Sequence, residues 1–231
     1  MKTLAVPPPN TLPTTVKIPA GYVDLEGELE LPPYAPGVVL FAHGSGLGKA
    51  HDQYLASVMR EAGLGTLQLD LLTKKEMQQD ARTSALRVEI DLLALRLISV
   101  TRWLEKQKAA RGLKIGYFGA STDGAATLIA AAELGDRIAA VVSRGGRPDL
   151  VGNVLQEVRS PTLFVVGGYD DLVLCLNDEA YGKLCCKKDF RVIPCATHHF
   201  EEPGKLDQVA QLSTHWFNRH MGKSADWEEA A

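Results

Sequence analysis

The stretch from Gly37 to Ala42, with the sequence GVVLFA, is the feature that most constrains the fold, because it contains no polar side chain. A strand that is apolar at every position, rather than at every second one, is typical of a strand buried on both faces of a parallel sheet. Parallel strands need crossover connections, which are usually helices that cover the sheet. This stretch therefore predicts an α/β fold.

Other apolar runs follow it and alternate with helical patterns. They are GTLQLDLL from residue 65, LKIGYFGAS from 113, IAAVVSRGG from 138, PTLFVVGGYD from 161 and DFRVIPCATH from 189. The longest helical pattern spans residues 85–108, and a further helix is expected over 124–133. Two strand patterns near the start, VKIPA and GELELP, have no helix between them, which predicts an antiparallel pair at one edge.

We therefore expect an α/β architecture: a mostly parallel central sheet of about eight strands with helices on both faces. The link between Pro148 and Pro161 has room for one short helix, so no cap domain is expected there. At 231 residues and 45% hydrophobic content the chain suits one domain. We assign residues 1–15, with four prolines, to a flexible arm, 16–221 to the folded domain, and 222–231 to a tail.

The charge of the chain bears on its partners. The net charge is −3 and both signs are scattered, so there is no basic stripe for nucleic acid and no polybasic anchor for a membrane. Neither a signal peptide nor an apolar run of membrane-spanning length is evident. We expect a cytoplasmic monomer or homodimer that binds a small-molecule substrate. The cysteines lack the spacing of a zinc or redox motif and are interpreted as reduced thiols: Cys175, Cys185, Cys186 and Cys195.

Three strand ends carry the side chains Ser121, Asp170 and His198. Ligands of a doubly wound sheet gather beyond the carboxyl ends of its strands. A serine hydroxyl becomes a nucleophile when a base takes its proton, and that base works best when a carboxylate fixes its tautomer. The order Ser, Asp, His is also that of a nucleophile on a sharp strand-to-helix turn. The pattern predicts a catalytic triad, which needs no metal or organic cofactor.

The residues around Ser121 depart from the usual pattern of such a turn. Gly119 satisfies the first glycine of G-x-S-x-G, but the second position holds Asp123, and the glycine follows at Gly124. Asp123 either lies harmlessly in the first helical turn, where the helix dipole favours an acid, or crowds the turn. The alternative interpretation is that Ser121 is an ordinary helix N-cap.

The segment His43-Gly44-Ser45-Gly46 supplies a second part of the predicted site. A tetrahedral intermediate needs two preorganised N–H donors for its oxyanion. We assign the backbone N–H groups of Ser45 and Thr122 to this oxyanion hole, and we expect His43 to hold the loop. The alternative is a glycine-rich turn without this role.

Rival residues are less suitable. Ser143 also ends a strand, but Val141 two positions before it is too bulky for the sharp turn, and Ser45 is followed by a loop rather than a helix. Asp171 begins the next helix, where an exposed acid is common. His199 comes second after its strand, and only one of two adjacent imidazoles can point at the nucleophile.

Two arginines follow the strand at 138–144. Arg144 and Arg147 are expected near the same rim, where they would bind a carboxylate or phosphate of the substrate. Pairing of Arg147 with Asp149 is the alternative. The neighbouring His199, Glu201 and Glu202 lack a spacing that would put metal ligands on one face, so no metal site is expected.

The segments VVLFAHGSG, IGYFGAST, VVSRGGRPDL, FVVGGYD and ATHHFEEPG together resemble the small, lidless α/β-hydrolases grouped with dienelactone hydrolases. The resemblance covers nearly all of residues 16–220 and implies Ser121 as nucleophile, Asp170 as acid and His198 as base. A dienelactone hydrolase proper uses a cysteine nucleophile, which leaves the substrate open. We expect hydrolysis of a small carboxylic ester, lactone or thioester; the alternatives are a non-catalytic binding module and an acyltransferase with the same triad.

Overall fold

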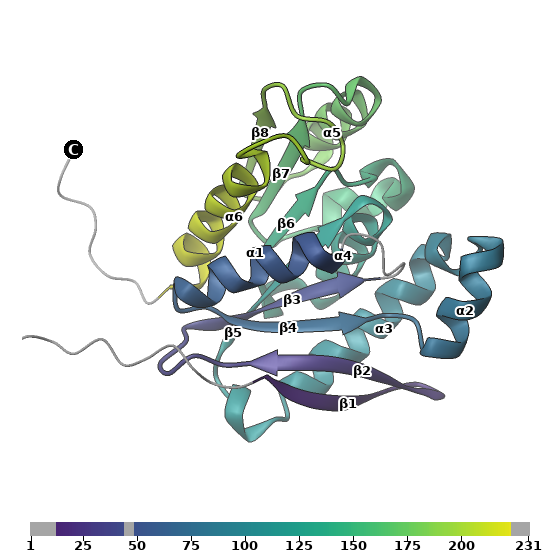
Figure 1. Ribbon diagram of the computed structural model, residues 1–231, viewed down its shortest axis with the longest axis vertical. Helices are drawn as coiled ribbons and strands as arrows, with labels where there is room; N and C mark the ends of the chain where they lie inside the picture. The colour runs from purple at the N-terminus through teal and green to yellow at the C-terminus, as the bar shows by residue number, and fades with distance from the viewer. Residues whose placement is uncertain (1–12, 44–48, 223–231) are drawn as a thin grey trace, which may run out of the picture.

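The computed structural model describes residues 13–43 and 49–222 (Figure 1). Most of the expected arm and tail, and Ser45 of the predicted oxyanion hole, lie outside the described residues. Eight strands form one sheet in the order β1-β2-β4-β3-β5-β6-β7-β8. This confirms the expected sheet.

The strands are β1 (Thr14–Ala20), β2 (Val23–Glu30), β3 (Gly37–His43), β4 (Gly65–Asp70), β5 (Lys114–Ala120), β6 (Ile138–Arg144), β7 (Thr162–Gly167) and β8 (Lys188–Ile193). β1 pairs antiparallel with β2, and β2 with β4, whereas the strands from β4 to β8 are parallel. The antiparallel pair predicted at one edge is therefore confirmed.

The α-helices are α1 (Lys49–Glu61), α2 (Lys74–Thr83), α3 (Ile90–Leu104), α4 (Ser121–Leu134), α5 (Asp171–Lys183) and α6 (Lys205–Met221). Short 3₁₀ segments are η1 (Leu86–Val88), η2 (Lys108–Ala110), η3 (Gly135–Arg137) and η4 (Pro148–Glu157). Figure 1 shows α1 and α6 on one face of the sheet, with α3 and α4 behind it. No helix in the described part of the chain is long and apolar enough to cross a membrane.

The helix expected over 85–108 is shorter than predicted. The buried carboxylate of Asp80 accepts the backbone N–H groups of Leu86 and Arg87 at 2.7 and 3.1 Å, which stabilises η1 as a separate turn. α3 therefore begins at Ile90. The link from Pro148 to Pro161 forms only η4, which is kinked at Gly152 (φ 63°), in agreement with the absence of a cap domain there.

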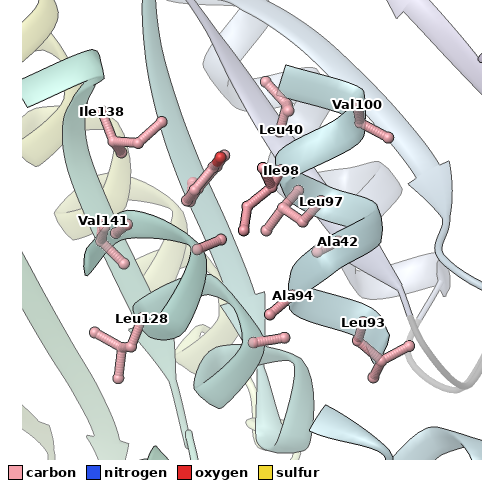
Figure 2. Close-up of a cluster of buried hydrophobic side chains, with 14 of the residues drawn as sticks. Leu40, Ala42, Leu93, Ala94, Leu97, Ile98, Val100, Leu128, Ile138 and Val141 are labelled. Carbon is pink, nitrogen blue, oxygen red and sulfur yellow. The ribbon is translucent and has the colours of Figure 1, made fainter. Parts of the chain in front are cut away.

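The strand β3 is buried at every position because helices cover both of its faces. Leu40 and Ala42 point to the face covered by α3 and α4, where Figure 2 shows them among Leu93, Ala94, Leu97, Ile98, Val100, Leu128, Ile138 and Val141. The alternate residues, Val39 and Phe41, pack on the face of α1 and α6. Two cores, one on each face, thus hold the strand that ends at His43.

Candidate active site

Ser121 lies where β5 ends and α4 begins. Its φ of 51° is in the left-handed region, which is strained for a residue with a side chain. A strained serine between a buried strand and a helix is the geometry of a nucleophile elbow. The N-cap of α4 is Ala120, which makes no side-chain capping bond, so Ser121 is not an ordinary N-cap.

Two glycines make room for this turn. A Cβ atom at Gly119 would lie 2.7 Å from the carbonyl oxygen of Asp123, so the turn needs glycine at that position. A Cβ atom at Gly124 would lie 2.7 Å from Oγ of Ser143 on β6. α4 therefore comes closest to β6 at Gly124, so this position needs glycine and position 123 does not. Asp123, which is 7% exposed, fits in the first turn of α4 for this reason.

His198 and Asp170 meet beyond the ends of β8 and β7. Their Nδ1 and Oδ2 atoms are 2.6 Å apart, and the side chains are 34% and 17% exposed. When Nδ1–H donates to the carboxylate, Nε2 of the ring is left to accept a proton from a hydroxyl group. Asp171, the rival acid, is exposed as the first residue of α5.

The loop after β6 runs beside His198 and bonds to Ser121. A Cβ atom at Gly145 would lie 3.2 Å from Cε1 of His198, and the backbone N–H of Arg147 donates to the Ser121 carbonyl at 3.1 Å. Hydrogen bonds among the described residues do not include one between the Ser121 hydroxyl and the His198 ring. Such contacts are often long in the absence of substrate.

A tight turn carries the histidine. The backbone N–H of Thr197 donates to Oε1 of Glu202 at 2.9 Å, and Phe200 N–H donates to the Thr197 carbonyl at 3.2 Å. Phe200 has a φ of 58° and is buried, so it anchors the turn in the core. Glu202 therefore has a structural contact, and no group of potential metal ligands occurs in residues 13–43 or 49–222.

One of the two residues of the predicted oxyanion hole lies within the described part of the chain. Thr122 is the second residue of α4, and the first backbone N–H groups of a helix have no partner within it and favour an anion. Ser45 lies outside the described residues, so its role stays a prediction. His43 is 4% exposed, and its Nδ1 atom lies 3.1 Å from Oδ2 of Asp52.

The two arginines differ from each other. Arg147 forms two hydrogen bonds to Asp149, at 2.8 and 2.7 Å, which is the alternative pairing that the sequence left open. Arg144 is 6% exposed, lies 3.8 Å from Oδ1 of Asp52, and its guanidinium is 5.8 Å from the centre of the Phe200 ring. It is therefore buried instead of projecting at the rim, because Asp52 of α1 and the ring of Phe200 lie against its guanidinium. Substrate binding by either arginine stays a prediction.

Three carboxylates influence the pKa of His43. Burial is the largest single influence on its pKa and lowers it, but the hydrogen bond and charge of Asp52, with the charges of Asp123 and Asp70, raise the pKa overall. Burial lowers the pKa of Arg144, and the charge of Asp52 opposes this effect. The centre of these interactions is therefore Asp52, a residue that the sequence analysis missed.

A signal for Asp52 exists in the sequence. The buried residues of α1 are Asp52, Leu55, Ala56 and Met59, the spacing of one helix face. An acid on an apolar stripe indicates a buried carboxylate with a partner, since buried charges are usually paired.

A cavity of about 230 Å³ lies beside β2 and β4. His43 contributes to its wall, but neither Ser121 nor His198 does. The geometry of the triad residues, rather than the size of this cavity, therefore identifies the candidate active site.

Comparison with known proteins gives consistent results. The structure matches that of a dienelactone hydrolase from Anabaena variabilis with 48% sequence identity and a TM-score of 0.88, over 90% of this chain and 98% of that chain. It also matches an α/β serine hydrolase without a lid from Xanthomonas campestris, with 19% identity and a TM-score of 0.73, over 94% of this chain and 98% of that chain. The second likeness supports the fold alone.

Two curated proteins from strains of Mycobacterium tuberculosis, provisionally named phosphoribosyl transferases, are each 47% identical over 208 residues. The match covers 89% of this chain but 46% of each relative, so the chain spans about half of their length. No family model matches the chain.

Proposed function

The chain belongs to the dienelactone hydrolase family of α/β-hydrolases, and on this premise we propose that it is a serine hydrolase of small carboxylic esters, lactones or thioesters. The observation that carries the proposal is the 2.6 Å contact between His198 and Asp170, and the strained backbone of Ser121 at the end of β5 supports it. The Gly145–Arg147 loop supports their action on one substrate, because it bonds to Ser121 through Arg147 and leaves little room for a side chain at Gly145 beside His198.

The reaction follows from the roles of these groups. His198 takes the proton of the Ser121 hydroxyl as its oxygen attacks the substrate carbonyl, and Asp170 stabilises the imidazolium that forms. The tetrahedral oxyanion accepts hydrogen bonds from the N–H groups of Thr122 and Ser45. The imidazolium then protonates the leaving group, and the acyl-enzyme is hydrolysed by a water molecule that His198 deprotonates.

The transferase name of the Mycobacterium relatives belongs to proteins longer than the region that this chain matches. The chain spans about half of their length, and a whole protein's activity does not follow from one half. The residues that gather beyond β5, β7 and β8 are suited to acyl transfer, because they combine a hydroxyl, an imidazole and a carboxylate.

Hydrolysis of p-nitrophenyl acetate by the wild type and the Ser121→Ala variant tests this function. We expect the variant to lose about 10⁴-fold or more in kcat/KM, because the nucleophile is absent. Ser143→Ala is the matched control, since this serine also lies at a strand end, is fully buried and carries no role in the reaction. Unchanged turnover by folded Ser121→Ala would contradict the proposal.

Product analysis in the presence of competing alcohols and amines separates hydrolysis from acyl transfer to another acceptor. The proposal predicts the free acid as the main product. A main product in which the acyl group is joined to the added alcohol or amine would identify an acyltransferase that uses the same triad.

A further inference from the structure

The sheet register places two charged residues on either side of the nucleophile. β5 lies between β3 and β6, and the paired residues are Ala42 with Gly119 and Ala120 with Arg144. The next position along β3 is His43, so His43, Ala120 and Arg144 form one row across the sheet, immediately before Ser121. Their side chains share the face that carries Phe41, which α1 and α6 cover.

Asp52 of α1 lies against the two charged residues of this row. One carboxylate oxygen, Oδ2, lies 3.1 Å from Nδ1 of His43, and the other, Oδ1, lies 3.8 Å from Nη2 of Arg144. All three side chains are less than 10% exposed. A single carboxylate thus connects the ends of the two strands that flank the nucleophile strand.

The connection continues to the base. The guanidinium of Arg144 lies over the ring of Phe200, which is two residues after His198. Gly145 follows Arg144, and a Cβ atom added there would lie 3.2 Å from Cε1 of the His198 ring. At its other end, His43 is the last residue before the segment that includes Ser45. The network of Asp52, His43 and Arg144 therefore adjoins two chain segments: the one that carries the base His198, and the one that contains the predicted oxyanion donor Ser45.

A contribution to stability does not explain why Asp52, His43 and Arg144 are buried together. Within residues 13–43 and 49–222, the buried Oδ1 atom of Asp52 and the buried Nε and Nη1 atoms of Arg144 have no hydrogen-bond partner. Buried ion pairs with unmet hydrogen bonds usually contribute less to stability than apolar side chains of the same size. A role in fixing the geometry of the site accounts for a charged network at this place.

We infer that Asp52 is a positioning residue of the proposed reaction: it ties His43 to Arg144 and so fixes the strand ends on either side of Ser121. The inference rests on the proposed function. Asp52 touches neither the substrate nor the reacting atoms, and it acts through the two residues that it holds. Its loss is expected to affect the chemical step more than substrate binding.

The Asp52→Asn variant tests this role with p-nitrophenyl acetate as substrate. We expect kcat to fall about 10- to 100-fold while KM stays within about twofold, because misplaced catalytic groups weaken the transition state more than the bound substrate. The rate of fluorophosphonate labelling of Ser121 should fall by a similar factor. A kcat within about twofold of the wild type, in folded Asp52→Asn protein, would overturn the inference.

Asp80→Asn is the matched control. Asp80 is a 1% exposed carboxylate paired with Arg87 at the end of α2 and η1, apart from the residues of the candidate active site. This variant should lower the melting temperature without a change in kcat. An equal loss of kcat in both variants would attribute the effect to general destabilisation and overturn the inference.

Asp52→Glu serves if Asp52→Asn does not fold. It keeps the charge but moves the carboxylate by one methylene, so a lower kcat at unchanged KM is expected, and an unchanged kcat would overturn the role. Failure of the proposed function has a different signature: the wild type itself would neither hydrolyse the ester nor react with the probe.

Discussion

The Oδ2 atom of Asp170 lies 2.6 Å from Nδ1 of His198, although the two residues are far apart in the chain. The parallel pairing of β7 with β8 brings them together, since Gly167 and Ile193 are partners at the ends of these strands. Asp170 follows the first strand end and His198 follows the second within a few residues. The contact is therefore a consequence of sheet register and two short loops.

The Asp170→Asn variant should lose about 10⁴-fold in kcat, because an amide no longer holds the imidazole in the tautomer that accepts a proton from the nucleophile. Asp171→Asn is the control, as that residue is exposed on α5. Steady-state kinetics of both variants with p-nitrophenyl acetate measure the difference. An equal effect of the two substitutions would argue against Asp170 as the partner of His198.

Gly124→Ala should destabilise the protein by about 1 to 3 kcal/mol, since the added methyl group would overpack the contact with Ser143. Part of this loss should return in the double variant Gly124→Ala/Ser143→Ala, which removes the hydroxyl that the new methyl group meets. Urea denaturation of the single and double variants gives the free energies of unfolding. Additive effects of the two substitutions would show that the contact is not the cause.

Stability should decrease in acid through Glu76. Hydrogen bonds from Arg96 are the largest influence on this carboxyl group and help to lower its pKa from 4.5 to about 2. A group whose pKa is lower in the folded state stabilises the protein above its unfolded pKa, and that stability is lost as the pH falls from about 4.5 towards 2. With allowance for partial exposure, the contribution is about 2 kcal/mol.

The Glu76→Gln variant tests this pH dependence. Its free energy of unfolding should vary less with pH than that of the wild type between about pH 4.5 and 2, as followed by denaturant titrations at each pH. Parallel pH profiles for the two proteins would rule out Glu76 as a source of the acid sensitivity.

Much of the fold could be predicted from local patterns in the sequence. The apolar run that became β3 indicates burial on both faces, and the two strand patterns without a helix between them indicate the antiparallel edge pair. The boundary of α3 could not be predicted in this way. It depends on the buried carboxylate of Asp80, which stabilises η1 through contacts that apolar periodicity does not record.

The candidate site was partly predictable for a related reason. Ser121, Asp170 and His198 follow strand ends, so parallel topology brings them to one edge of the sheet. The environment of Arg144 depends instead on its contacts with Asp52 of α1 and with Phe200, which come from distant segments that a strand-end pattern does not relate. That position 123 can hold an aspartate instead of the usual glycine likewise depends on a packing contact, because α4 meets β6 at Gly124.

The most direct test of the account is reaction of the folded protein with a fluorophosphonate, followed by mass spectrometry of its peptides. The account predicts one adduct, on Ser121, and much slower labelling of a His198→Gln variant, because the hydroxyl then lacks its base. An adduct on another serine, or no adduct on a wild-type protein that is folded, would contradict it.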